Sequence, residues 1–419
     1  MNADLLQQVI ADQRLMISRK DRGMVRHIDI NKHLRTNQIS VITGVRRSGK
    51  SILTLQIADH YDAFHFVSFD DERLIGFVVG DFNDMLIELK KTGNAQTIVL
   101  DEVQLVEGWE RFVRRLNDEG YKVIVTGSNA RMLSSELATH LTGRYLKTEL
   151  FPLSYAEYLD FCNIDVSDKS SETKARMLVA FDHYLQHGGF PEYVKTDILE
   201  VLQRIYDDIL YRDLIVRFGI RNVSGFKNLA QYLFTNFTSE SGYLPLANML
   251  GFSSATSVRD YISILQEGYL IFEVNQYDHS RKKQYQTNRK TYVIDNGLRN
   301  AVSFRTSADN GRLLENAVFL ELRRRGCDTW YYRSRNNLET DFLVQADKQE
   351  LYQVCYEMQN PQTRKRELAS LSACMRELHV AKGVVLTKNE EETISVAEGT
   401  IEVIPSWKWM IGSPTLKHR

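Results

Sequence analysis

The sequence predicts an α/β chain of several domains that begins with a parallel sheet. Apolar segments of strand length begin at 39, 64, 97 and 122, and stretches with helical spacing separate them. Strands that alternate with helices are typical of a parallel sheet. The 419 residues are enough for about three domains of ~150 residues each, so further domains are expected after this sheet.

The composition excludes several classes of protein. Lys and Arg number 53 against 54 Asp and Glu, a formal net charge of −1, which argues against a uniformly basic nucleic-acid coat protein but leaves local basic patches open. The sequence has no run of 18 apolar residues and no basic segment followed by an apolar leader, so we expect no membrane partner and a cytoplasmic location. The four cysteines form no C-x-x-C pair, which agrees with a reducing compartment.

The first strand ends in a phosphate-binding pattern. Residues 44–51 have the form Gly-x-x-x-x-Gly-Lys-Ser, and an apolar helical stretch follows, which completes the P-loop arrangement. The glycines let backbone N–H groups surround a phosphate, and the helix N-terminus adds the positive end of its dipole. Lys50 is expected to reach the β- and γ-phosphates of ATP, and Ser51 to hold Mg²⁺. The predicted nucleotide contacts are Gly44, Arg47, Ser48, Gly49, Lys50, Ser51 and Ile52.

Two later strand ends carry polar side chains suited to hydrolysis. The strand that begins at 97 ends in two carboxylates, of which Asp101 is predicted to lie beside Mg²⁺ and Glu102 to accept a proton from the attacking water. Ser128 or Asn129, at the end of the next strand, would contact the water or the γ-phosphate, and Asn129 is the candidate we select. A plain helix cap is the alternative for both.

Several motifs closely resemble prokaryotic AAA-type ATPases, which are related to archaeal ATPases of the signal-transducing NTPase group. The motifs are GVRRSGKS at 44–51, LDEVQ at 100–104, VTGSNARML at 125–133 and LTGRY at 141–145, and the likeness continues over nearly the whole chain. The resemblance implies ATP binding and hydrolysis, with Lys50 and Ser51 as the Walker A pair and Asp101 and Glu102 as Walker B.

The same resemblance suggests two arginines for the γ-phosphate. Arg144, in the LTGRY motif, is a candidate because a guanidinium is always charged and presents a rigid fork of donors. Arg212, in the segment YRDL, is a weaker candidate. For each, the alternative is a structural arginine that caps a helix or pairs with an acid. If either acts in trans, the protein is a homo-oligomer.

The middle of the chain is predicted to form a helical lid followed by a winged helix. The winged helix would comprise two helices near 244–250 and 258–265 and then a basic hairpin. Such cations would contact phosphates without reading sequence. The alternative is a module that docks protein and carries a solvated basic hairpin. The hairpin cations are Arg281, Lys282, Lys283, Arg289 and Lys290.

The C-terminal part resembles the restriction-endonuclease-like fold, whose signature is an acid followed by (Asp/Glu)-x-Lys on the next strand. Glu315 would be the helix acid, Asp341 the metal-binding aspartate, and Gln353 a weak carbonyl ligand. Cys355 stands where that pattern has lysine, so we favour a catalytically silent relative over an active nuclease. The cations that would replace the lysine from elsewhere are Arg335, Lys348 and Lys365.

These expectations give a division into five parts and a function with one alternative. We expect a Mg²⁺-dependent ATPase that acts as a nucleotide-driven switch on or with nucleic acid. The alternative is a nucleotide-gated signalling or scaffold ATPase whose C-terminal modules bind protein, without nuclease activity. The predicted parts are an N-terminal helical segment (1–35), the P-loop core (36–150), the helical lid (151–220), the winged helix (221–300) and the restriction-endonuclease-like domain (301–419).

Overall fold

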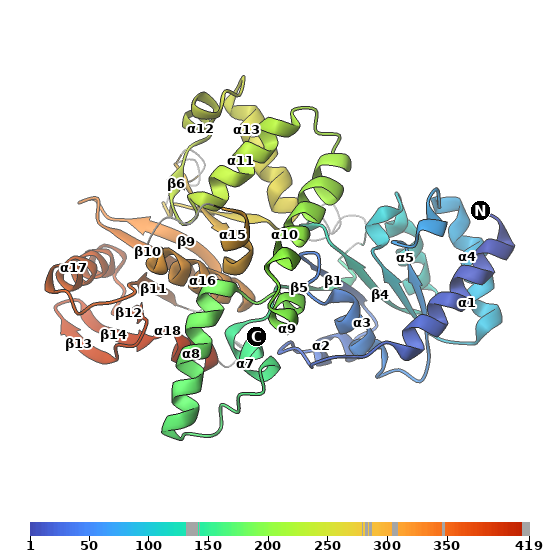
Figure 1. Cartoon of the computed structure of the whole chain (residues 1–419), viewed down its shortest axis with the longest axis horizontal. Helices are drawn as coiled ribbons and strands as arrows, with labels where there is room; N and C mark the ends of the chain where they lie inside the picture. The colour runs from blue at the N-terminus through green and yellow to red at the C-terminus, as the bar shows by residue number, and fades with distance from the viewer. Residues whose placement is uncertain are drawn as a thin grey trace. The chain divides into compact units, whose positions relative to one another are not determined.

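The computed structural model describes residues 1–130, 141, 143–278, 280, 284, 287–303, 309–345 and 348–412. The chain divides into two compact units, Met1–Phe151 and Pro152–Arg419 (Figure 1). The first unit contains one five-stranded sheet, and the second contains a three-stranded and a six-stranded sheet. The α/β class predicted from the strand and helix spacing is confirmed.

The sheet of the first unit is parallel, with strand order β2-β3-β4-β1-β5. Because the strands are parallel, their carboxyl ends meet at one edge, which is where ligands of such sheets bind. The polar residues that follow each strand are therefore brought together. The strands are β1 (Ile39–Gly44), β2 (Phe64–Ser68), β3 (Thr97–Asp101), β4 (Lys122–Gly127) and β5 (Tyr145–Leu150).

Helices cover both faces of this sheet. One face packs against α1 (Ala3–Arg19), α4 (Phe82–Thr92) and α5 (Trp109–Asp118), and the other against α3 (Lys50–Ala58). Apolar residues of α1 belong to the same core as the sheet, so the N-terminal segment is part of the first compact unit. Short elements in the described part of this unit are α2 (Asn31–Leu34) and the 3₁₀ turns η1 (Glu72–Leu74), η2 (Val79–Asp81) and η3 (Val103–Leu105).

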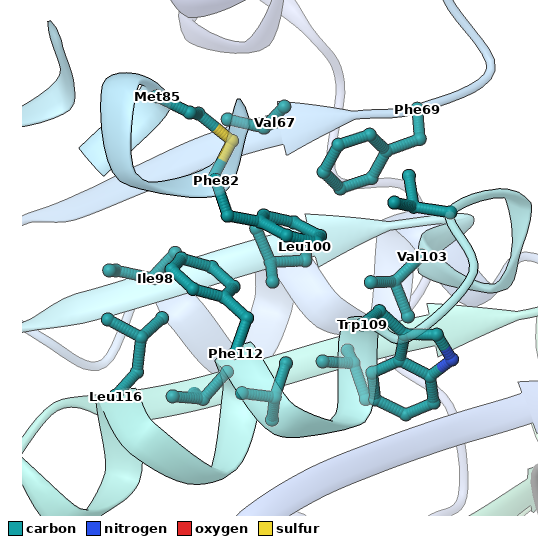
Figure 2. Packing of buried hydrophobic residues seen from close by; sticks show 14 of the residues in the cluster. Val67, Phe69, Phe82, Met85, Ile98, Leu100, Val103, Trp109, Phe112 and Leu116 are labelled. Carbon is teal, nitrogen blue, oxygen red and sulfur yellow. The ribbon is translucent and has the colours of Figure 1, made fainter. Parts of the chain in front are cut away.

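The apolar residues of α5 are spaced so that they lie on one face of the helix, and this face packs in the core of the first unit. Trp109, Phe112, Val113 and Leu116 are spaced i, i+3, i+4 and i+7, and all are buried. The rings of Phe112 and Phe82 stack with centroids 4.2 Å apart (Figure 2). Burial of several large side chains at once fixes α4 and α5 against the sheet.

The second unit begins with helices and continues with mixed structure. The predicted lid region, 151–220, is helical, and it ends in the π-helical segment η5 (Asp208–Val216), an uncommon conformation. Among the described residues of this unit, the α-helices are α7 (Tyr155–Phe161), α8 (Ser171–His187), α9 (Pro191–Thr196), α10 (Leu199–Asp207), α11 (Val223–Thr235), α12 (Tyr243–Leu250), α13 (Ala255–Glu267), α15 (Asn296–Val302), α16 (Asn310–Arg324), α17 (Pro361–Leu378) and α18 (Ser406–Ile411).

Two sheets complete the second unit. A three-stranded sheet has order β6-β8-β7, and a six-stranded mixed sheet has order β13-β14-β12-β11-β10-β9. The strands β9, β10 and β11 are antiparallel, whereas β11, β12 and β14 run parallel. The bounds are β6 (Glu240–Ser241), β7 (Ile271–Asn275), β8 (Arg289–Val293), β9 (Asp328–Arg333), β10 (Glu339–Gln345), β11 (Gln349–Val354), β12 (Lys382–Thr387), β13 (Glu392–Val396) and β14 (Gly399–Pro405).

Candidate nucleotide site

The candidate site begins in the loop between β1 and α3. Gly44 has φ 147° and lies against β5, where an added Cβ would be 2.0 Å from the Leu150 carbonyl oxygen. Gly49 has φ 99° and precedes the first residue of α3. Both positions require glycine, the first for the close approach of two backbones and the second for its left-handed conformation. The pattern Gly-x-x-x-x-Gly therefore has a structural cause at each end.

Lys50, the first residue of α3, is buried beneath this loop. Its ammonium donates to the Val45 carbonyl oxygen at 3.0 Å and lies 3.9 Å from a carboxylate oxygen of Glu102. The Ser48 hydroxyl in the same loop is buried and has no hydrogen-bond partner among the described residues. The loop thus offers a buried cation and a hydroxyl in the place where the motif predicts phosphate. Arg47, with φ 66°, and Ile52 in the first turn of α3 are less buried than Lys50 and Ser48.

Asp101, at the carboxyl end of β3, faces Ser51. The Ser51 hydroxyl lies 3.0 Å from both carboxylate oxygens of Asp101, and the Thr126 hydroxyl donates to one of them at 2.5 Å. Burial and then the adjacent Glu102 raise the pKa of Asp101 above its ordinary value. A hydroxyl and a buried carboxylate are oxygen ligands of the kind that Mg²⁺ takes, so these residues fit that ion.

Glu102 follows directly in a left-handed conformation, with φ 52°. Residues other than glycine rarely adopt this conformation, and such strain is concentrated at functional sites. One Glu102 carboxylate oxygen accepts from Gln104 at 2.5 Å and from the Ser128 hydroxyl at 3.1 Å. Burial raises the pKa of Glu102. The Lys50 ammonium and then the hydrogen bonds from Gln104 and Ser128 outweigh burial and bring the pKa below its ordinary value.

Three residues that were not singled out from the sequence contact this site. Thr126 accepts the Glu102 backbone N–H at 3.0 Å, in addition to its bond to Asp101. Gln104, two residues after Glu102 in the sequence, donates to the Glu102 carboxylate. Arg26 donates to the Ser48 carbonyl oxygen at 2.8 Å and so connects the N-terminal segment to the loop. No sequence motif marks Arg26, because its contact depends on the folded position of a distant segment.

The two further catalytic candidates of this unit lie differently. Asn129 is buried, and its backbone carbonyl accepts from the Thr43 hydroxyl at 3.1 Å, while the side chain that contacts Glu102 is that of Ser128. Arg144 is exposed, pairs with Asp118, and immediately precedes β5, at the amino edge of the sheet. A six-residue strand separates it from the carboxyl edge, about 20 Å. Arg144 therefore does not join the site of its own chain.

The C-terminal acids also come together, around an unexpected cation. Lys290 of β8 lies 3.2 Å from Glu315 of α16, 3.2 Å from Asp341 and 2.7 Å from Glu339, both of β10. Its interpretation as an exposed wing cation that contacts phosphate is wrong, because the side chain is buried against these acids. Burial lowers the pKa of Lys290, but the carboxylates, Glu315 first, outweigh burial and hold the pKa well above its ordinary value.

The other C-terminal and wing candidates are placed as follows. Gln353 lies beside Asp341 across the β10–β11 pair, and Cys355 is buried with its thiol directed to the Glu357 carbonyl. The guanidinium of Arg289 lies over the Tyr243 ring at 4.7 Å. The cations Arg281, Lys282 and Lys283 lie outside the described residues. Arg212 is part of η5.

Among the described residues, no helix is both long enough and apolar enough to cross a membrane.

Comparison with known proteins agrees with this geometry. Residues 36–159 match the AAA domain family, and residues 179–309 and 310–409 match two domains of unknown function, DUF8612 and DUF4143. An uncharacterized protein from Methanocaldococcus jannaschii is 37% identical over an alignment 427 positions long, which covers 97% of this chain and 95% of that protein. An uncharacterized protein from Haemophilus influenzae is 32% identical over an alignment 346 positions long, which covers 77% of this chain and 84% of that protein.

Two solved structures are similar to part of the chain. The Walker-type ATPase PABY2304 of Pyrococcus abyssi has a TM-score of 0.42 at 14% identity, over 65% of this chain and 93% of that chain. A signal-transduction ATPase with numerous domains, PH0952 from Pyrococcus horikoshii, has a TM-score of 0.29 at 15% identity, over 73% of this chain and 46% of that chain.

The parallel sheet with its loop at the carboxyl edge defines a nucleotide-binding P-loop protein of the AAA type. The chain belongs to a family of prokaryotic AAA-type ATPases that includes the M. jannaschii and H. influenzae proteins.

Proposed function

We propose that the chain binds ATP together with Mg²⁺ at the β1–α3 loop and hydrolyses it. The observation that carries the proposal is the position of Glu102. This residue directly follows Asp101 in the sequence, and its carboxylate lies 3.9 Å from the Lys50 ammonium. This chemistry requires a cation that binds phosphate, an acid that binds metal and a general base, and the three residues supply one each.

Binding uses the loop and the first turn of α3. Backbone N–H groups of residues 44–52 surround the phosphates, and Lys50 exchanges its bond to the Val45 carbonyl for the β- and γ-phosphate oxygens. Ser51 and Asp101 would hold Mg²⁺, and that ion would supply positive charge beside the γ-phosphate. Arg26 keeps the loop in place through the Ser48 carbonyl.

Hydrolysis uses Glu102 as general base. Its pKa is lowered, so the group is a carboxylate at neutral pH and can accept a proton from the attacking water. Gln104 and Ser128 both bond to the same oxygen, Oε2, which orients the carboxyl group and leaves Oε1 toward Lys50. Asn129, one residue beyond Ser128, remains the sensor candidate.

The test is the steady-state ATPase rate of Glu102→Gln. We expect the rate to fall about 10²- to 10⁴-fold, because the amide cannot accept the proton, while ATP binding is retained. Glu107→Gln is the matched control, since Glu107 is an exposed glutamate five residues later. Undiminished turnover of Glu102→Gln would remove Glu102 from the role of base.

We propose in addition that the nucleotide state controls an action on or with nucleic acid. The basic segment that begins at Arg281 supports this, because clustered cations favour phosphate contacts. The alternative is a signalling or scaffold ATPase that binds protein partners. The burial of Lys290 and the position of Arg289 over Tyr243 favour the alternative, since they leave fewer cations for phosphate.

A further inference from the structure

Three carboxylates of the second unit converge on one ammonium ion. Lys290 donates to Glu315 and Asp341, at 3.2 Å each, and its ammonium lies 2.7 Å from Glu339. The lysine is 5% exposed and comes from β8, whereas the acids come from α16 and β10. The contacts connect segments separated by 25 to 51 residues in the sequence.

The restriction-endonuclease-like resemblance implies a divalent metal between Glu315 and Asp341. Such an ion binds carboxylate oxygens at about 2.1 Å, between the two acids. The Lys290 ammonium already lies within hydrogen-bond distance of both carboxylates, so a second cation there would contact it and be repelled. The residues present therefore do not fit a resident divalent ion while Lys290 occupies this position.

The three acids also have partners other than Lys290. Tyr292, also on β8, donates its hydroxyl proton to Glu315 at 2.8 Å, and the backbone N–H of Val354 donates to the second oxygen of Asp341 at 2.9 Å. Glu339 also pairs with Arg333. A buried charge is tolerated when it is paired and hydrogen-bonded in this way.

One oxygen beside the cluster is not satisfied. The register that pairs Phe342 with Tyr352 puts Gln353 opposite Asp341, on the same face of the sheet. Gln353 is 6% exposed, and its Nε2 donates to Glu367 at 2.7 Å. Its carbonyl oxygen, Oε1, is buried and has no hydrogen-bond partner among the described residues. An amide carbonyl oxygen is a ligand for a hard cation, and this one belongs to the residue opposite Asp341.

We propose that Lys290 is a built-in cation that occupies the divalent-metal position of the C-terminal domain and holds β8 against it. The domain then has no metal-bound water for hydrolysis at this position. Removal of the ammonium leaves Glu315, Asp341 and the Gln353 carbonyl as an open divalent-cation site. Glu339 keeps Arg333 as its partner.

The test counts Mn²⁺ ions bound by the nucleotide-free full chain, by titration followed with electron paramagnetic resonance. The wild type and its Asp341→Asn variant are expected to bind the same number of ions, because any Mn²⁺ at the β1–α3 loop contributes equally to both. Lys290→Ala is expected to bind one additional Mn²⁺ per chain, and Lys290→Ala/Asp341→Asn to lose it.

Lys382→Ala is the matched control. Lys382 pairs with Glu402 at 2.9 Å on the surface of the same domain, so its removal also deletes one cation. This variant is expected to bind no additional Mn²⁺, because a single carboxylate does not form a site.

A wild-type Mn²⁺ ion that Asp341→Asn removes would overturn the proposal, since the position would then hold a resident metal. A folded Lys290→Ala that gains no ion would also overturn it. If Lys290→Ala fails to fold, the near-isosteric Lys290→Met is used, with the thermal midpoint of unfolding as a second readout. Mn²⁺ is expected to raise that midpoint for Lys290→Met and not for Lys290→Met/Asp341→Asn, and equal midpoints would contradict the proposal.

Discussion

His33 is a buried histidine that makes the stability of the chain depend on pH. Its two ring nitrogens bond to the Ser40 hydroxyl at 3.0 Å and to the Thr148 hydroxyl at 2.8 Å. Burial, followed by the nearby cations Lys32 and Lys122, lowers the pKa of His33 from 6.5 to about 3. At pH values between about 3 and 6.5, His33 is protonated in the unfolded chain and neutral in the folded chain. The folded state therefore becomes less stable as the pH falls below 6.5.

The His33→Gln variant is expected to lose this dependence. At pH 5 protonation of His33 in the unfolded wild type lowers the unfolding free energy by about 2 kcal/mol. Glutamine does not take up a proton, so the variant has no such loss. Urea unfolding at pH 7 and pH 5 measures it, with the exposed His60→Gln as control. If the unfolding free energy falls equally from pH 7 to pH 5 in the wild type and in His33→Gln, His33 is not the group responsible for the pH dependence.

Single residues also show where prediction from the sequence stops. Lys50, Ser51, Asp101 and Glu102 could be predicted because the phosphate loop and the ends of neighbouring parallel strands fix local positions by motif and spacing. The cation near Asp341 could not be predicted. It comes from β8, and only the packing of β8 against α16 and β10 brings Lys290 to the acids.

At the scale of elements, α5 makes one of the best-defined contacts of the core. Phe112→Ala is expected to lower the unfolding free energy by about 3–5 kcal/mol, because it leaves a cavity next to the buried ring of Phe82. Arg114→Ala, on the exposed side of the same helix, is the control and is expected to change stability by less than about 0.5 kcal/mol. Urea unfolding measures both, and similar losses in the two variants would contradict the role given to the Phe112–Phe82 stack.

Strands were predicted well where burial makes them continuously apolar. In the first unit β1 to β4 follow apolar segments, because both faces of a parallel sheet are covered. The strand β13 was not predicted. Its residues alternate between half-buried and exposed at the edge of the six-stranded sheet, so the apolar signal is weak.

At the scale of the whole chain, the candidate phosphate site lies in the first compact unit and the C-terminal modules lie in the second. An arginine at the amino edge of the sheet, such as Arg144, reaches a γ-phosphate only in a second copy of the chain, so that role requires an oligomer. In the proposed function the first unit supplies the nucleotide chemistry, and the purpose of that chemistry depends on what the second unit binds.

The ATPase rate in the presence of nucleic acid tests that partner. We expect single-stranded DNA, duplex DNA or RNA to stimulate the rate, and the stimulation to fall steeply with salt, because contacts between cations and phosphates release counterions. Replacement of Arg281, Lys282 and Lys283 by alanine is expected to reduce the salt slope by about 1 for each phosphate that the protein no longer neutralises. Lys382→Ala, an exposed cation of the C-terminal domain, serves as control, and Lys50→Ala as the blank.

An absence of stimulation by every polymer, with ATP still bound, would contradict the nucleic-acid proposal and favour the protein-binding alternative. That alternative predicts slow turnover that does not depend on nucleic acid and rises when the partner binds. The burial of Lys290 bears on the choice between these two functions. Because Lys290 is buried against acids, only the other cations of the basic segment can contact nucleic-acid phosphates. A salt slope unchanged in the triple variant would show that the stimulating polymer binds elsewhere on the chain.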